Sequence, residues 1–118
     1  MYAGEDDPAT LHFAALGPSG EVLAVGSVMA EPHPRDPREG DWRVRGMATA
    51  PELRGLGLGA RVLQALEDAA RERGARRLWC NARSGAGAFY ERAGFVAEGE
   101  EFELPDIGAH FVMSRPLP

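Results

Sequence analysis

Residues 51–63, PELRGLGLGARVL, place glycines at positions 55, 57 and 59, immediately ahead of a run with helical spacing. A glycine within a helix costs about 1 kcal/mol relative to alanine, so three of them here need a physical reason. The start of a helix presents unpaired backbone N–H groups and the positive end of the helix dipole. Glycines let an anion approach that backbone, and the guanidinium of Arg54 adds a charged donor. The stretch therefore predicts a phosphate or pyrophosphate site.

Three kinds of phosphate-binding loop are rich in glycine and can be compared with this stretch. A Walker loop needs Lys and then Ser or Thr after its last glycine, and Ala60 stands there instead. A dinucleotide fingerprint is met by the first two glycines and Ala60, but it requires a parallel βαβ unit with an acidic residue about 20 positions later. That interval holds Arg76 and Arg77, and the strands upstream look antiparallel. The third pattern, R/Q-x-x-G-x-G/A, is satisfied by Arg54 and the last two glycines.

The elements that must position this loop can be read from periodicity. Strand patterns cover residues 11–16, 21–31, 41–50, 77–82, 95–104 and 110–115, and helix patterns cover residues 58–73 and 86–93. Leu58, Val62 and Leu66 recur at helical spacing, and Gly74 follows as a helix-ending residue. Gly46 interrupts the third strand pattern, which indicates a β-bulge or a close backbone approach. The order predicts an α/β fold with a mixed sheet, in one domain of all 118 residues.

Composition narrows the class of protein. The net charge of −5 argues against a non-specific nucleic-acid binder, which would be basic. No apolar run approaches the roughly 20 residues that span a bilayer, and the acidic, polar N-terminus is unlike a secretory signal. Cys80 is the only cysteine, so no intramolecular disulfide can form, which fits a cytoplasmic location. No His, Cys, Asp or Glu set has metal-ligand spacing, so we expect no metal.

Two blocks of sequence resemble one known family. Residues 47–59, MATAPELRGLGLG, look like the signature of the GNAT superfamily, the acyl-CoA-dependent N-acyltransferases. Residues 78–83, LWCNAR, followed by residues 88–95, AFYERAGF, resemble a second block of that family, and the two occur in the family's order. The resemblance implies a mostly antiparallel sheet in which the strands at 41–50 and 77–82 splay apart. Helices flank that sheet.

The resemblance also implies roles for individual residues. The pantetheine arm of acetyl-CoA would fit the gap between the splayed strands. Backbone groups of Met47, Ala48 and Thr49 would pair with it like an extra strand. The pyrophosphate would lie on Arg54, Gly55, Leu56, Gly57, Leu58, Gly59 and Ala60. Asn81 would bind the pantetheine amide region, and Tyr90 would lie near the thioester sulfur and protonate the leaving thiolate.

Each of these side chains has a competing structural interpretation. Tyr90 could be an ordinary core aromatic, and Asn81 could cap the end of a strand. Cys80 is expected to be buried rather than nucleophilic. His33 is expected at the surface or in a strand. His110 is more simply a structural histidine, although it could contact substrate. The base of the reaction stays open, and a water relay to Glu103 or to His110 could supply it.

We therefore expect an N-acetyltransferase that moves an acetyl group from acetyl-CoA to a small-molecule or peptide amine, by direct attack in a ternary complex. Nucleic acid and membrane are not expected partners, and a homodimer is expected. Family members open with a strand and two helices that line the acceptor pocket, whereas about ten residues precede the first hairpin here. That difference leaves open a catalytically silent acyl-CoA-binding or interaction module. An NAD(P)-binding fragment is a weaker third alternative.

Overall fold

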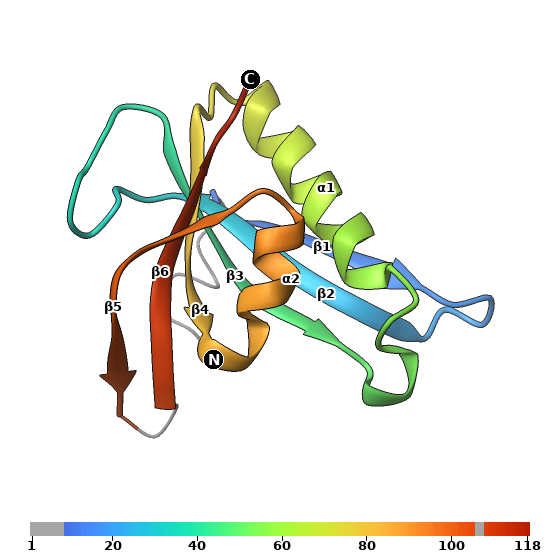
Figure 1. The fold of residues 1–118 in the computed structure, drawn as a ribbon. Coiled ribbons are helices and arrows are strands. Elements are labelled where there is room, and N and C mark those ends of the chain that lie inside the picture. The colour runs from blue at the N-terminus through green and yellow to red at the C-terminus, as the bar shows by residue number, and fades with distance from the viewer. Residues whose placement is uncertain (1–8, 106–107) are drawn as a thin grey trace.

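The computed structural model describes residues 9–105 and 108–118 (Figure 1). Its strands are β1 (Leu11–Leu16), β2 (Val22–Ala30), β3 (Asp41–Thr49), β4 (Arg77–Arg83), β5 (Val96–Leu104) and β6 (Gly108–Pro116). Its helices are α1 (Leu58–Glu72) and α2 (Gly87–Arg92), with 3₁₀ turns at Pro51–Leu53 and Ser84–Ala86. The predicted order of strands and helices is confirmed, with boundaries that differ by one to a few residues.

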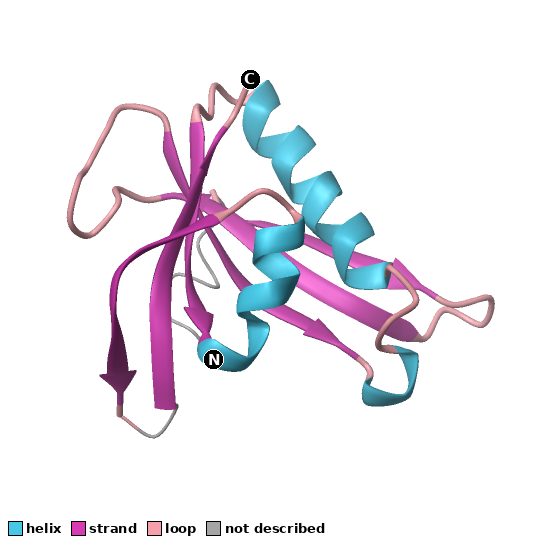
Figure 2. Ribbon diagram, viewed as in Figure 1, coloured by secondary structure: helices cyan, strands magenta, loops and turns pink. Residues whose placement is uncertain are grey.

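The six strands form one sheet in the order β1-β2-β3-β4-β6-β5 (Figure 2). Every neighbouring pair is antiparallel except β3 and β4, which run parallel. The parallel pair joins only at Asp41 with Arg77, Trp42 with Leu78 and Arg43 with Trp79. Beyond these positions β3 and β4 diverge, as their arrows in Figure 1 show. The predicted splay of the central strands is confirmed.

We call residues 41–43 and 77–79 the closed end of this strand pair, and residues 44–49 and 80–83 the open end. Side chains alternate between the two faces of a strand. On β4, Leu78, Cys80 and Ala82 belong to the core that packs against the helices. The neighbouring positions, Trp79, Asn81 and Arg83, therefore lie on the opposite side of the sheet, which we call the far face.

Both helices lie on one side of the sheet (Figure 1). Helix α1 contacts β1, β2 and β3, and α2 contacts β4 and β5. The spacing of Val62, Leu66 and Ala70 on α1 places all three in the core, where each is at most 3% exposed. The two helices thus cover the two halves of the sheet on either side of the gap between β3 and β4.

The predicted bulge at Gly46 is confirmed. The β2–β3 register shifts between Val25 and Ser27, opposite this glycine, and Gly46 has φ of +68°. A positive φ is costly for residues that carry a Cβ, which explains glycine at this position. The bulge lies where β3 has just left β4, at the inner limit of the open end.

A buried polar network holds the closed end. The Asp41 carboxylate accepts hydrogen bonds from Arg77 Nε at 2.8 Å and from the backbone N–H groups of Arg38 and His33 at 2.7 and 3.1 Å. Burial alone would raise the pKa of Asp41, but these hydrogen bonds outweigh it and lower the pKa to about 2. The same pairing raises the pKa of Arg77. The network anchors the loop between β2 and β3 to β4.

His33 belongs to this network. The expectation of a surface or strand position is wrong, because the residue is only 3% exposed and lies in the loop between β2 and β3. Its Nδ1 accepts the backbone N–H groups of Arg35 and Asp36, both at 3.1 Å. The proton therefore lies on Nε2, which donates to Glu98 of β5 at 2.6 Å. One imidazole thus connects the loop after β2 to the outer strand of the sheet.

No helix among the described residues is both long enough and apolar enough to cross a membrane.

Candidate functional site

The loop between β3 and α1 ends in an exposed helix N-terminus. Gly57 is the residue before α1, has φ of +80° and leaves the helix without a side-chain cap. The first bond into the helix runs from Arg61 N–H to the Gly57 carbonyl at 3.1 Å, so the N–H groups of residues 58–60 precede the ladder. No acidic side chain stands in this first turn. The predicted position of the glycines, between a strand and a helix, is confirmed.

The three glycines have two different physical reasons. Gly55 and Gly57 have φ of +87° and +80°, and a Cβ built on either would meet nothing within 4 Å. Their backbone conformation favours glycine, and the space above them is open. At Gly59, by contrast, a Cβ would lie 3.2 Å from the Phe89 ring of α2 and 3.4 Å from Thr49 Oγ1. The third glycine therefore lets α1 pack closely on α2 and β3.

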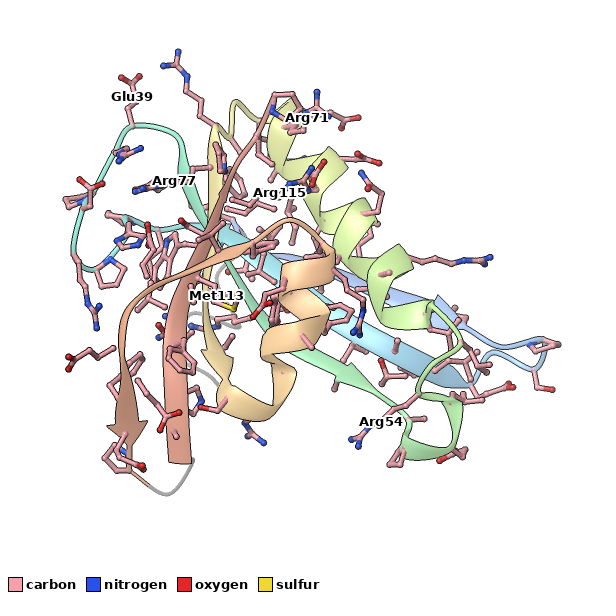
Figure 3. The ribbon with its side chains drawn as sticks, in the orientation of Figure 1. Glu39, Arg54, Arg71, Arg77, Met113 and Arg115 are labelled. Atoms are coloured by element: carbon pink, nitrogen blue, oxygen red, sulfur yellow. The ribbon has the colours of Figure 1, made fainter. Side chains whose placement is uncertain are left out.

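Arg54 stands on this loop, at the far end of β3 from the closed-end network around Arg77 (Figure 3). Arg54 is exposed, and among the described residues its guanidinium has no ion-pair partner. A free guanidinium beside open N–H groups gives the loop the character of an anion site.

Met47, Ala48 and Thr49 lie in the part of β3 that has left β4. On their other side, Ala48 and Thr49 pair with Val25 and Ala24 of β2. Within the described residues, the edge of β3 that faces the gap has no strand partner beyond Arg43. An unpaired strand edge binds an extended chain through its backbone N–H and C=O groups.

Asn81 stands across the gap on β4, and its side-chain oxygen Oδ1 is enclosed without a hydrogen-bond partner in the described part of the chain. Arg43 Nε, at the last paired residue of β3, is the other such atom in the described part of the chain. Enclosed polar atoms are paired in the great majority of proteins, because an unpaired one costs free energy. These two atoms therefore mark the sides of the gap as a place where a polar ligand would gain hydrogen bonds. Sequence reasoning missed Arg43, although its alternation with the core residues Trp42 and Val44 indicated the far face.

Tyr90 lies on α2 and is 6% exposed. Its ring packs edge-on against Phe89 and Phe95, with centroids 5.0 and 5.4 Å away. The hydroxyl has no hydrogen-bond partner among the described residues, and it is not one of the enclosed unpaired atoms, so it reaches accessible space. Burial raises the pKa of Tyr90, with a smaller contribution from Cys80. The ring is more enclosed than expected, and the hydroxyl keeps its proton at neutral pH.

Cys80 is buried, as expected, at 1% exposure. Burial raises the pKa of its thiol to about 12, against a smaller lowering by Arg43. The nucleophilic form of cysteine is the thiolate, so this residue is inert at neutral pH. Among the described residues, no group of three or more His, Cys, Asp or Glu side chains could hold a metal ion.

Comparison with known proteins gives this geometry a context. Residues 2–95 match the acetyltransferase (GNAT) family. An uncharacterised N-acetyltransferase of Bacillus subtilis strain 168, YitI, is 32% identical over 98 residues, which are 83% of this chain and 66% of the relative. The chain thus spans just under two thirds of that relative's length.

Two solved structures are similar over nearly the whole chain. A nourseothricin acetyltransferase has a TM-score of 0.77 at 30% identity, covering 97% of this chain and 69% of that one. An aminoglycoside 6'-N-acetyltransferase complexed with coenzyme A has a TM-score of 0.76 at 15% identity, covering 95% and 76%, and it shows likeness of fold alone.

The splayed strands, the glycine loop at the helix N-terminus and the match over residues 2–95 agree, and the chain belongs to the acetyltransferase (GNAT) family.

Proposed function

We propose that this protein transfers an acetyl group from acetyl-CoA to the nitrogen of an amine. The observation that carries the proposal is the end of β3–β4 pairing at Arg43 and Trp79, beside the open N-terminus of α1. This arrangement puts an unpaired strand edge next to an anion site. Acetyl-CoA has the matching parts, which are an extended chain with two amides and a pyrophosphate.

Different residues around the gap are suited to bind different parts of acetyl-CoA. The N–H groups at the start of α1, with Arg54, suit the pyrophosphate. The free edge of β3 from Met47 to Thr49 suits the pantetheine amides. Asn81 Oδ1 is an acceptor without a partner, so an amide N–H of pantetheine would remove the cost of leaving it unpaired.

The chemistry that follows is direct transfer. Cys80 is held as a neutral thiol, which disfavours an acyl-cysteine intermediate. The amine nitrogen attacks the thioester carbonyl, and a β3 backbone N–H near Ala48 or Thr49 polarises the carbonyl oxygen. The C–S bond then breaks, and Tyr90 donates its proton to the leaving sulfur. Holding amine and thioester together supplies much of the rate.

The acceptor approaches from the far face, because the helices cover the other one. A hollow of about 460 Å³ lies over β1, β2 and β3, and its lining includes Ser27, Gly46 and Ala48. This hollow reaches the inner limit of the gap. A small-molecule or peptide amine would fit such an opening.

Two measurements test this function. Calorimetry with acetyl-CoA, CoA and NADPH separates an acyl-CoA site from a dinucleotide site, and we expect binding of the first two alone. Release of free thiol across a panel of primary amines then measures transfer. Tight binding of acetyl-CoA without thiol release from any amine would favour the silent binding module. Binding of NADPH alone would reject both acyl-CoA functions.

We also propose a cytoplasmic homodimer. Large apolar side chains are exposed at the β1–β2 hairpin, where Leu16 is 61% and Val22 58% exposed and the two residues face each other in the sheet. β1 is an edge strand, so a second copy could cover this patch. Sedimentation of a monomer at high micromolar concentration would reject the dimer.

A further inference from the structure

His110 lies on the far face, on β6, which is separated from the open end of the gap by β4 alone. It pairs with Arg83 of β4, and the neighbouring β6 positions Phe111 and Met113 pack into the core on the helix side. By alternation, the His110 side chain therefore shares the far face with Asn81 and Arg83. Asn81 pairs with Val112, two residues along β6, so His110 is its diagonal neighbour, within reach of long side chains.

The ring of His110 is held in one tautomer. Its Nδ1 lies 2.8 Å from the carbonyl oxygen of Gly108, an atom that can only accept a hydrogen bond. Nδ1 therefore carries the proton, and in the neutral ring the lone pair is on Nε2. The residue is 3% exposed, and Phe102 of β5 packs against it, with ring centroids 6.0 Å apart and the ring planes tilted by 35°. The backbone and this aromatic contact fix where Nε2 points.

Nε2 itself is available. It has no hydrogen-bond partner among the described residues, and it is not one of the enclosed unpaired side-chain atoms, so it reaches accessible space. A buried, oriented imidazole with a free lone pair is the arrangement in which histidine accepts a proton.

We propose that His110 is the general base that takes a proton from the acceptor amine. The inference rests on the proposed acetyl transfer. Tyr90 packs in the core on the helix side, whereas His110 faces the far side, from which the amine approaches. The acid and the base of the reaction thus lie on opposite faces of the sheet, and the proposal places the thioester between them, in the gap between β3 and β4. In this geometry the attacking and leaving groups each have their own proton partner.

Every proton that moves in the proposed reaction has a donor and an acceptor. The amine nitrogen forms the C–N bond as the C–S bond breaks, and its surplus proton passes to His110 Nε2. Nδ1–H stays bonded to the Gly108 carbonyl, which stabilises the imidazolium. The sulfur receives the proton of Tyr90. Water then removes the proton from His110 and returns one to Tyr90, so an amine and a thioester become an amide and a thiol.

The decisive variant is His110→Asn. Its amide N–H₂ stands near the position of Nδ1 and can keep the bond to the Gly108 carbonyl, but it offers no base at Nε2. We expect acetyl-CoA affinity by calorimetry within about threefold of wild type and thiol release lower by roughly 10²-fold with the best primary alkylamine of the panel. His110→Gln is the second variant, because it puts an amide near Nε2 and tests the same loss if the first fails to fold.

Hydroxylamine separates a base from a structural role. It is mostly uncharged at neutral pH, whereas an alkylamine is protonated and must lose a proton before attack. We therefore expect the His110→Asn loss to shrink to less than about tenfold with hydroxylamine, a reduction from the roughly 10²-fold effect of a general base. We also expect added imidazole to restore part of the thiol release of His110→Ala.

Full thiol release by His110→Asn with the alkylamine would overturn the assignment while leaving acetyl transfer intact. An equal loss with the alkylamine and with hydroxylamine, without rescue by imidazole, would make His110 structural and overturn it too. Failure of the wild-type protein to release thiol with any amine would instead remove the proposed function, and this inference with it.

Discussion

The two ends of the β3–β4 pair both carry polar groups, but they differ in whether those groups have hydrogen-bond partners. At the closed end, the Asp41 carboxylate has four hydrogen-bond donors, the Nε and Nη2 of Arg77 and the backbone N–H groups of Arg38 and His33. Among the described residues, two enclosed side-chain atoms have no partner: Asn81 Oδ1 at the open end and Arg43 Nε at the border between the two ends. At the open end, Gly57 also leaves N–H groups without a side-chain cap. Figure 3 places Arg77 and Arg54 at opposite sides of the molecule, one at each end.

The difference separates stability from function. Buried polar groups cost free energy unless they are paired, so a fully paired network such as that of Asp41 stabilises the fold. An unpaired group at the open end gains only when something else supplies its partner. We therefore expect substitutions at the closed end to change stability, and substitutions at the open end to change binding and turnover.

The largest effect is expected at Gly57. Gly57→Val adds a branched side chain over the open N–H groups, and we expect acetyl-CoA binding to fall below detection in calorimetry. The backbone strain of a side chain at positive φ is roughly 1–2 kcal/mol, which the fold can survive.

Gly74→Val is the matched control for this substitution. Gly74 follows the other end of α1, has φ of +90° and also has nothing within 4 Å of a built Cβ. We expect it to lose similar stability and to bind acetyl-CoA normally. Equal binding by the two variants would contradict an anion site at the N-terminus of α1.

The next effect is expected at the closed end. Asp41→Ala leaves the buried guanidinium of Arg77 without its main partner, and breaking a buried pair costs about 3–5 kcal/mol. Urea unfolding measures this loss. The control is Asp36→Ala, because Asp36 also approaches Arg77, at 3.6 Å, but its side chain is 57% exposed, so we expect less than about 1 kcal/mol. Similar losses in both variants would mean that burial does not distinguish the two carboxylates.

Tyr90→Phe tests whether the tyrosine hydroxyl acts in catalysis at the open end. It keeps the ring that packs on Phe89 and Phe95 and removes the hydroxyl that has no partner in the described structure. We expect acetyl-CoA affinity within a few-fold of wild type and a turnover lower by roughly 10²-fold, the lower end for general acid catalysis. Thiol-release kinetics measure the turnover. Unchanged turnover would remove Tyr90 from the mechanism, and loss of the fold would make it structural.

The smallest effect is the dependence of stability on pH. The pKa of Asp41 falls from 3.8 to about 2 on folding, so this carboxyl contributes stability above pH 3.8. That contribution, about 2 kcal/mol, is lost as pH falls through 3.8 toward 2. Urea unfolding of wild type and Asp41→Asn across this range measures it, and we expect a shallower acid loss in the variant. Identical slopes would assign the acid loss to other carboxyls.

The spacing of apolar residues and glycines along the sequence was enough to predict much of the fold. The order of strands and helices, the loop ahead of α1 and the bulge at Gly46 follow from periodicity and from the conformations that glycine alone adopts readily. Two sequence blocks sufficed to identify the family. The places of Met47 on β3 and Asn81 on β4 follow from the same blocks, since each stands at a set distance from a strand end. The role of Tyr90 near the thioester stays a prediction.

Only the tertiary structure decided which polar groups are paired. His33 bonds to Glu98, 65 residues away, and Arg77 bonds to Asp41, 36 residues away, so no local pattern indicates either contact. The close packing that requires glycine at position 59 comes from Phe89 on another helix. Whether a polar group is paired or buried depends on which distant segments of the chain meet around it. A linear sequence records which groups are polar, and the folded chain decides which of them remain without a partner.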